Sequence, residues 1–400
     1  MRKKAPRDRT PPARPPAPTL GKTVAEFFSG IGLMRLGLDQ AGWTTVFAND
    51  IEEEKAEMYR HHFHASNKEL VVDDIHNIGA NEVPNVTLAT ASFPCNDLSL
   101  AGGRAGLEGI QSSAFWGFIR ILREMRQRKP PIVLLENVTG FLSSKEGADF
   151  EAALVALNEL GYSVDALIID AVHFVPQSRQ RLFVIGRLGG TVTARTCETP
   201  DFFESGVRPP ALAKFIFEHP AINWSIRQLP MLPNRQQQLE DILEALPDNN
   251  AAWWSKERVD YLTNQMSVRH RVLADAMAAR RVWSYGTVFR RVRNERSMAE
   301  LRTDGIAGCL RTPRGGSGRQ ILFKAGYGRF MARLLSPREC ARLMGAEDFL
   351  IGASLNQALF GFGDAVCVKV VEWIAIHYLN PLFDEQVPLP AVNERMQVRY

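Results

Sequence analysis

The 400-residue sequence contains few cysteines and no long apolar run. Its five cysteines are odd in number and widely spaced and form no CxxC pair, which argues against a disulfide framework and a zinc site. No stretch approaches the roughly 20 apolar residues that span a bilayer, and no secretory signal is recognisable. We therefore expect a cytoplasmic protein with free thiols, no metal and no membrane segment.

Net charge is also small, at +4, but it is unevenly distributed. Residues 256–335 hold 17 basic and 6 acidic side chains, a net charge of +11, which leaves the rest of the chain acidic. Most of these basic residues are arginines, whose planar guanidinium groups suit phosphates and guanine edges, and Trp283, Tyr285 and Phe289 lie among them. A charged run is usually only a solvated surface, but so local an arginine excess predicts nucleic-acid binding.

Apolar segments of strand length alternate with amphipathic helical segments from residue 22 to about residue 187. This pattern is typical of the α/β class and predicts a doubly wound, mostly parallel sheet. The last two predicted strands, VDALIIDAVHF and RLFVIGRL, are joined by a short loop, so we expect them to form a hairpin at the edge of the sheet.

Changes in composition divide the chain into four expected segments. The basic, proline-rich residues 1–20 are expected to be disordered. Residues 21–187 are expected to form the domain that binds a cofactor and carries the chemistry. Residues 188–330, rich in Pro, Asn, Arg and Trp, predict a smaller, irregular domain, and residues 331–400 are expected to return to the first domain and pack a C-terminal helix on it.

Glycines and acids follow the first three predicted strands. Gly30 and Gly32 in EFFSGIG lie between a strand and a helix, where backbone amides can meet an anionic ligand. Asp50 ends the second strand, where an acid can accept both hydroxyls of a ribose, and Asp74 with Ile75 ends the third, which suits adenine. Each acid alone is more often a helix cap, but the series predicts a nucleoside cofactor, either NAD or S-adenosylmethionine.

A single cysteine follows the fourth predicted strand in ASFPCNDLSLAG. By default Cys95 would be a small buried apolar residue. Pro94, however, fixes its own φ and removes a backbone donor, which holds the next side chain at the ligand-binding edge of the sheet. Glu136 ends the next strand in LLENVTG, and Arg179 and Arg181 lie two residues apart in PQSRQRLF, so a strand would direct both to one face.

A thiol, a desolvated carboxyl and two guanidiniums answer one chemical problem, the activation of carbon 5 of a pyrimidine. The thiolate of Cys95 would add to carbon 6 while Glu136 protonates or hydrogen-bonds N3 and an arginine holds O2. Carbon 5 then attacks a methylsulfonium, loses its proton and expels the thiol. A base inside a duplex would first have to be flipped out.

The sequence resembles the DNA cytosine-5 methyltransferases from about residue 22 to residue 380. EFFSGIG is similar to the cofactor loop of that family, FPC to its nucleophile motif, ENV to its glutamate motif and PQSRQR to its Gln-x-Arg-x-Arg motif. SPRECARLMG resembles the helix after the target-recognition region, and GFGDAV resembles the last motif. The resemblance implies the S-adenosylmethionine-dependent methyltransferase fold, S-adenosylmethionine as cofactor, double-stranded DNA as substrate, and a target-recognition domain over residues 188–330.

Roles for individual residues follow from the same resemblance. It implies that Cys95 is the nucleophile, that Glu136 contacts N3 and the exocyclic amine, and that Arg181 holds O2 while Arg179 supports the site. The residues implied to line the cofactor pocket are Phe28, Gly30, Gly32, Asp50, Ile51, Asp74, Ile75, Pro94 and Asp364.

Three positions depart from the commonest family pattern. Asn96-Asp97 stands where Gln followed by a small residue is usual, Asp50 replaces a Glu, and Asp364 replaces an Asn. The first departure bears on a loop that closes over flipped DNA, and the last is expected to weaken a contact to the cofactor. None removes a catalytic group.

Three alternatives to DNA cytosine-5 methylation are less consistent with the sequence. An RNA cytosine-5 methyltransferase would share the fold, but the arginine-rich insert favours DNA. A non-catalytic DNA-binding relative would lack Cys95 or Glu136, and both are present. Methylation of an amino group needs no thiol. We expect a monomer whose further partners are a cognate restriction enzyme or phage-defence proteins.

Overall fold

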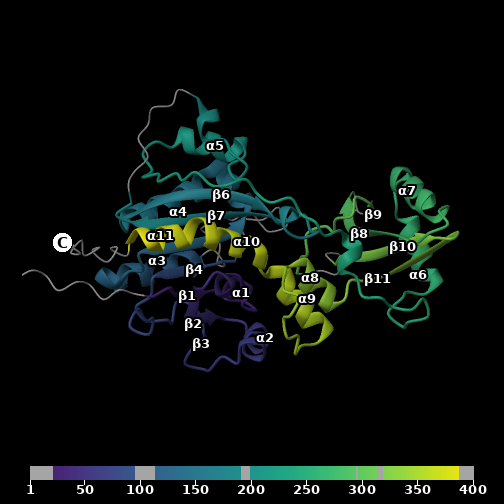
Figure 1. Ribbon diagram of the computed structural model, residues 1–400, viewed down its shortest axis with the longest axis horizontal. Helices are drawn as coiled ribbons and strands as arrows, with labels where there is room; N and C mark the ends of the chain where they lie inside the picture. The colour runs from purple at the N-terminus through teal and green to yellow at the C-terminus, as the bar shows by residue number, and fades with distance from the viewer. Residues whose placement is uncertain (1–20, 95–112, 191–198, 294–295, 313–318, 387–400) are drawn as a thin grey trace, which may run out of the picture.

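The protein forms two lobes in the computed structural model (Figure 1), which describes residues 21–94, 113–190, 199–293, 296–312 and 319–386. The expected disordered segment 1–20, the expected nucleophile Cys95 and the neighbouring departure Asn96-Asp97 lie outside the described residues. Each lobe is built on a sheet of its own.

The larger lobe contains a seven-stranded sheet in the order β3-β2-β1-β4-β5-β7-β6. Its strands are β1 (Thr23–Phe27), β2 (Thr44–Asp50), β3 (Leu70–Val72), β4 (Leu88–Ala91), β5 (Ile132–Val138), β6 (Tyr162–Asp170) and β7 (Gln180–Leu188). Neighbouring strands are parallel except that β7 runs antiparallel to both β5 and β6. The predicted mostly parallel sheet with a hairpin at its edge is therefore confirmed.

Helices cover both faces of this sheet because its strands are apolar on both sides. Along β5, Val133 and Leu135 pack in one core cluster, whereas Ile132 and Leu134 pack in another. The first cluster includes α3 (Ser113–Met125) and α4 (Ala148–Glu159), and the second includes α1 (Leu33–Gln40) and α10 (Val368–Ile374). A further helix, α2 (Glu53–Phe63), packs against β2 and β3.

The C-terminal helices return to the larger lobe, as Figure 1 shows. They are α8 (Pro337–Leu343), α9 (Leu355–Asp364), α10, a π-helical turn (Ala375–Leu379) and α11 (Asn380–Gln386). Leu379 and Leu382 are buried in the same cluster as Ile132 of β5. The end of the described chain therefore packs against the central sheet.

Part of the region 188–330 also packs into the larger lobe. After a short 3₁₀-helix (Pro200–Phe203), α5 (Pro210–Glu218) places the ring of Phe215 4.9 Å from that of Phe150 in α4, measured between centroids. This stretch, which the composition groups with the smaller domain, therefore packs against the larger lobe.

The second lobe (residues 255–334) is built on a four-stranded antiparallel sheet in the order β11-β10-β8-β9. Its elements are α6 (Lys256–Asn264), α7 (Val268–Ala278), β8 (Ser284–Arg293), β9 (Arg296–Arg302), β10 (Ile321–Gly326) and β11 (Arg329–Leu334). The irregular composition of this region gave no indication of these strands. In β9 only Ala299 and Leu301 are buried, because they point to the apolar cluster of this lobe and the side chains between them point away from it.

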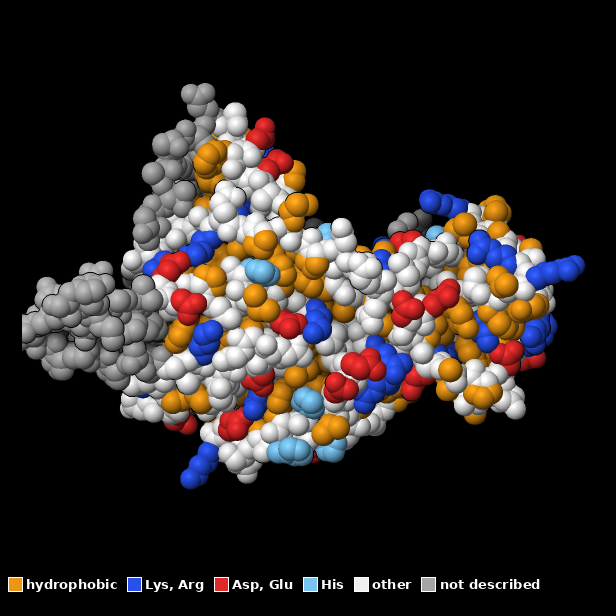
Figure 2. Space-filling model, viewed as in Figure 1, with side chains coloured by type: hydrophobic (Ala, Val, Ile, Leu, Met, Phe, Trp, Pro, Cys, Tyr) orange, Lys and Arg blue, Asp and Glu red, His pale blue; other side chains and the backbone are white. Residues whose placement is uncertain are grey.

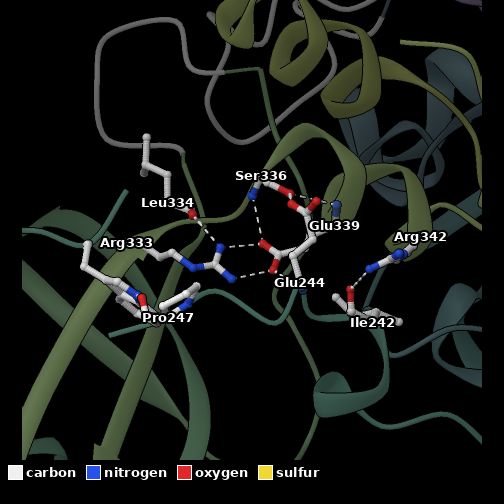
Figure 3. A network of polar contacts seen from close by, with 9 residues as sticks. Ile242, Glu244, Pro247, Arg333, Leu334, Ser336, Glu339 and Arg342 are labelled. Carbon is white, nitrogen blue, oxygen red and sulfur yellow. Dashed lines mark hydrogen bonds and ion pairs between the residues drawn. The ribbon is translucent and has the colours of Figure 1, made fainter. Parts of the chain in front are cut away.

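A buried ion pair joins the second lobe to α8 (Figure 3). The guanidinium of Arg333 in β11 donates to both oxygens of Glu339, at 2.7 and 2.5 Å, and both side chains are almost inaccessible to solvent. The carboxylate of Glu339 also accepts from the backbone N–H groups of Ser336 and Glu244, at 2.8 and 2.9 Å. Four donors therefore satisfy this buried charge.

We expect Glu339→Gln to lower the free energy of unfolding by about 3–5 kcal/mol, because it leaves the Arg333 cation buried without its counter-charge. Urea denaturation followed by circular dichroism measures this loss. The matched control is Glu347→Gln, which removes an exposed partner of Arg342 and should cost no more than about 1 kcal/mol. Equal losses of unfolding free energy in the two variants would show that burial of the Arg333–Glu339 pair adds no stability beyond that of an exposed pair.

Candidate active site

Most of the predicted site residues lie at the edge of the larger sheet where its parallel strands end. Phe28 follows β1, Asp50 ends β2, Pro94 lies three residues beyond β4, and Glu136 lies near the end of β5. Because these neighbouring strands run parallel, their carboxyl ends meet at one edge, which is where α/β sheets bind ligands.

The loop after β1 turns sharply into α1. Phe28, Gly30 and Gly32 have φ angles of 57°, 55° and 86°, a region that glycine adopts readily and phenylalanine rarely. A Cβ atom at Gly32 would lie 2.4 Å from the ring of Phe63, so a side chain there would collide with α2. This geometry explains the glycines of EFFSGIG and brings the first turn of α1 to the ligand-binding edge.

Asp50 braces this loop with both of its carboxylate oxygens. Oδ2 accepts from the backbone N–H of Gly30 at 2.7 Å, and Oδ1 accepts from that of Glu52 at 2.9 Å. Burial raises the pKa of Asp50, although Lys55 and the two N–H groups oppose this shift. The carboxylate therefore shapes the loop itself, a role that the sequence analysis did not assign to it.

The two isoleucines predicted to contact the cofactor differ in exposure. Ile51, after β2, is 62% exposed, whereas Ile75 is 4% exposed and belongs to the core. Asp74 lies at the surface and accepts from the backbone N–H of His76 at 2.9 Å. Ile51 thus offers apolar surface to a flat ligand, and the main contacts of Ile75 are with the protein core.

Glu136 and Arg181 form a buried ion pair at the end of β5. Nε of Arg181 lies 3.0 Å from Oε1 of Glu136, whose side chain is 8% exposed. Burial raises the pKa of Glu136, and the charges of Arg181 and Arg179 together with a hydrogen bond from Ser92 oppose it only in part. The carboxyl is therefore poised to hold a proton at higher pH than an ordinary glutamate.

Arg179 reaches other partners. Its Nη1 donates to the carbonyl of Leu310 at 2.8 Å, and its Nη2 donates to the carbonyls of Gly363 and Ala365 at 3.0 and 2.6 Å. The side chain is 1% exposed. Arg179 therefore ties the end of α9 to the segment that contains Leu310.

Two amides that the sequence analysis did not single out also position the site. Asn137, next to Glu136, donates to the carbonyl of Phe93 at 3.3 Å and so anchors the chain two residues before Cys95. Gln177 is fully buried, accepts from the backbone N–H of Leu310 at 2.9 Å and donates to the carbonyl of Leu343 at 2.7 Å. Their positions within the ENV and PQSRQR motifs were the available signal.

Asp364 connects three separate segments. Its Oδ2 accepts from Nζ of Lys55 in α2 at 2.9 Å, and its Oδ1 accepts from the hydroxyl of Thr312. The backbones also approach closely, because a Cβ atom at Gly363 would lie 2.7 Å from the nitrogen of Thr312. The acid that departs from the common pattern thus has a cation beside it.

Basic and aromatic side chains of the second lobe lie together. The guanidiniums of Arg291 and Arg311 lie 5.4 and 5.5 Å from the ring centroid of Phe289. Figure 2 shows further Lys and Arg side chains projecting from this lobe.

Other kinds of site find less support. A cavity of about 500 Å³ is lined by Phe174, Arg342, Trp373 and their neighbours, but by none of the predicted site residues. Within the described ranges, no group of three His, Cys, Asp or Glu side chains is arranged to hold a metal ion. No helix among these residues is long and apolar enough to cross a membrane.

Comparison with protein families and curated proteins gives consistent matches. The family model for C-5 cytosine-specific DNA methylases matches residues 22–379. The chain is similar to the type II methyltransferase M.HhaI of Haemophilus parahaemolyticus, with 27% identity over 89% of this chain and 93% of the relative. It is also similar to the type II methyltransferase M.DsaV of Dactylococcopsis salina, with 28% identity over 89% of this chain and 85% of the relative.

Solved structures share the fold at lower identity. The S. pombe Dnmt2 methyltransferase matches with a TM-score of 0.59 and 20% identity, covering 90% of this chain and 99% of its own. The Entamoeba histolytica methyltransferase EhMeth matches with a TM-score of 0.60 and 16% identity, covering 92% and 99%.

Proposed function

This chain belongs to the C-5 cytosine-specific DNA methylases and therefore methylates cytosine in DNA at carbon 5, and we propose that Cys95, Glu136 and Arg181 carry out the chemistry. We further propose that the cytosine lies in a specific double-stranded sequence and is flipped out of the helix to reach these residues. In this proposal Cys95 is the nucleophile, Glu136 acts at N3 and the exocyclic amine, and Arg181 holds O2.

The buried pair of Glu136 and Arg181 supports this proposal most strongly. A carboxyl with a raised pKa, 3.0 Å from a guanidinium, presents a proton donor and a cation side by side at the edge of the sheet. In cytosine, O2 is carried by carbon 2, which is bonded to N3. The proton donor can therefore act at N3 while the cation holds O2. Asn137 anchors the chain close to Cys95, which brings the nucleophile motif to the same edge.

In the proposed reaction Cys95 adds to the ring and is later released from it unchanged. Addition of the thiolate to carbon 6 pushes electrons toward N3, where Glu136 supplies a proton, and leaves carbon 5 nucleophilic. Carbon 5 then attacks the methyl group, and the bond between that methyl group and the sulfonium sulfur breaks to leave a thioether. Loss of the carbon 5 proton to a base expels the thiolate and restores the aromatic ring, and N3 returns its proton to Glu136.

We propose S-adenosylmethionine as the methyl donor, because its sulfonium makes the methyl group electrophilic. Gly30 has a positive φ angle and open space where a Cβ atom would stand, which leaves room for a ligand beside α1. Asp50 presents a buried carboxylate at the end of β2, and Ile51 exposes apolar surface beside it. An adenosine with a charged tail fits this donor set, in which Phe28, Asp74, Ile75, Pro94 and Asp364 complete the proposed pocket.

The second lobe is proposed to read the DNA, together with the rest of the region 188–330. Its excess of arginines attracts phosphates, and the Arg291–Phe289–Arg311 group offers both charge and a stacking surface. We also propose that residues 21–187 and 331–400 form the catalytic domain and that the enzyme acts as a cytoplasmic monomer. A cognate restriction enzyme or phage-defence proteins are its proposed biological partners.

Parallel assays with two acceptors test the choice of polymer. The purified protein is incubated with S-adenosylmethionine labelled in its methyl group and with either unmethylated bacterial DNA or total transfer RNA. We expect label in the DNA and none above background in the RNA. Label in the RNA alone would favour the RNA cytosine-5 alternative.

A further inference from the structure

The contacts of Asp364 join α2, which follows the Asp50–Glu52 turn, to the segment that contains Thr312. Lys55 lies in α2, immediately after the Asp50–Glu52 turn, and its Nζ lies 2.9 Å from Asp364 and 3.2 Å from Glu52. The side chain of Lys55 is 14% exposed and that of Asp364 is 42% exposed, so the ion pair is partly shielded from solvent on the side of Lys55. Asp364 is thus paired with the helix that follows the Asp50–Glu52 turn.

The other oxygen of Asp364 holds Thr312, which ends a described segment of the second lobe. This segment is also fixed by Gln177 and Arg179, which bond the backbone of Leu310 at 2.9 and 2.8 Å. Gly363 lies against the backbone of Thr312, where a Cβ atom would not fit. The segment is therefore packed against the end of α9, and movement of one displaces the other.

We propose that Asp364 is a positioning residue that couples cofactor binding to DNA binding, by holding Lys55 of α2 and Thr312 of the second lobe together. This inference rests on the proposed function, since it requires the cofactor at the Asp50–Ile51 edge and DNA on the second lobe. A ligand that fixes the position of α2 then also fixes Thr312 through Asp364, so each ligand tightens the other by the same factor.

The position of the acid also explains why a carboxylate replaces the usual amide there. An asparagine at position 364 would accept the hydrogen bond from Thr312 but would not neutralise Lys55. Burial alone would raise the pKa of Asp364, but Lys55 and the hydrogen bond from Thr312 lower it below its usual range, so the acid is charged at neutral pH. The departure from the family pattern therefore strengthens one link of the connection.

Binding measurements on the full-length protein test this coupling. Bisulfite sequencing of DNA from cells that express the enzyme first identifies its target sequence. Affinity for an unmethylated fluorescent DNA duplex that carries this sequence is then measured with and without saturating S-adenosylhomocysteine, which has no methyl group to transfer. The reciprocal affinity for S-adenosylhomocysteine is measured by calorimetry with and without the duplex. For the wild type we expect both ratios to be equal and to lie at about 10-fold or more, within the usual range of coupling.

Asp364→Asn, Lys55→Met and Thr312→Val should each reduce both ratios to about 2-fold or less. The double variant Lys55→Met/Asp364→Asn should lose no more coupling than either single variant, because both substitutions break one connection. Glu53→Gln is the matched control, since it removes an acid of the same helix that pairs with Arg60 instead. Thermal melting identifies any variant whose fold is lost, and the remaining variants then decide.

Wild-type ratios near 1, unchanged coupling in Asp364→Asn, or losses that add in the double variant would each overturn the proposal. A purely electrostatic effect of charge removal would appear in Glu53→Gln as well and would also count against it. If the wild type bound neither S-adenosylhomocysteine nor the duplex, the proposed function itself would be wrong, and the coupling that rests on it would be wrong as well.

Discussion

Cys95→Ser should abolish methyl transfer while leaving the binding of DNA and S-adenosylmethionine largely intact. A serine hydroxyl is far less ionised than a thiol at neutral pH, so the variant lacks the nucleophile that adds to carbon 6. Transfer of labelled methyl groups to DNA measures the rate, and calorimetry measures the binding. The loss should exceed that of any other single substitution, because no other group is proposed to bond to the base.

Covalent trapping provides the control for Cys95→Ser. DNA with 5-fluorocytosine at the target position should form a denaturation-resistant complex with the wild type, because fluorine cannot leave carbon 5 as a proton does. The serine variant should form none. Substantial turnover by Cys95→Ser, or trapping that survives the substitution, would refute the assignment of the nucleophile.

Glu136→Gln should lower kcat by about 10²–10⁴-fold, the usual contribution of a general acid. Glutamine has nearly the same shape but carries no acidic proton for N3, and it leaves Arg181 without its carboxylate partner at 3.0 Å. The control is Asp149→Asn, which alters another buried carboxylate, one that accepts from Ser144 at 2.5 Å. Single-turnover rates within a few-fold of wild type for Glu136→Gln would exclude an acid role for Glu136.

The pH profile gives a second readout of Glu136. Burial raises its pKa, so the protonated form persists to higher pH than in an ordinary glutamate. The wild-type rate should fall as pH rises through this pKa, while the growing thiolate fraction of Cys95 acts in the opposite direction. Glu136→Gln has no proton to lose and should lack the falling limb. The same limb in both proteins would assign that proton to another group.

Features encoded by local pattern were predictable from the sequence. The apolar run before Glu136 is a strand buried on both faces, because consecutive residues such as Val133 and Leu134 pack against helices on opposite sides. The glycines of EFFSGIG follow a strand and precede a helix, and the structure gives both glycines positive φ angles. Strand ends and glycine turns therefore carried most of the information about the site.

Features that depend on distant partners were not predictable. Lys55 and Asp364 are 309 positions apart, and Arg179 bonds Ala365 across 186 positions, so no local pattern announces either contact. The two isoleucines at strand ends look alike in sequence, yet Ile51 is exposed and Ile75 is buried, because α3 covers only the latter. In the second lobe, the arginines of β8 and β9 obscured the alternation that marks a one-sided sheet.

Expression in bacteria that lack their own DNA methylation, followed by bisulfite sequencing, tests the central claim most directly. Protected cytosines report the modified base and its flanking sequence in one experiment, and cells expressing Cys95→Ser provide the background. We expect protected cytosines that share a defined flanking sequence in the wild type and none in the variant. An absence of protection in cells that contain the folded, cofactor-bound enzyme would contradict the central claim.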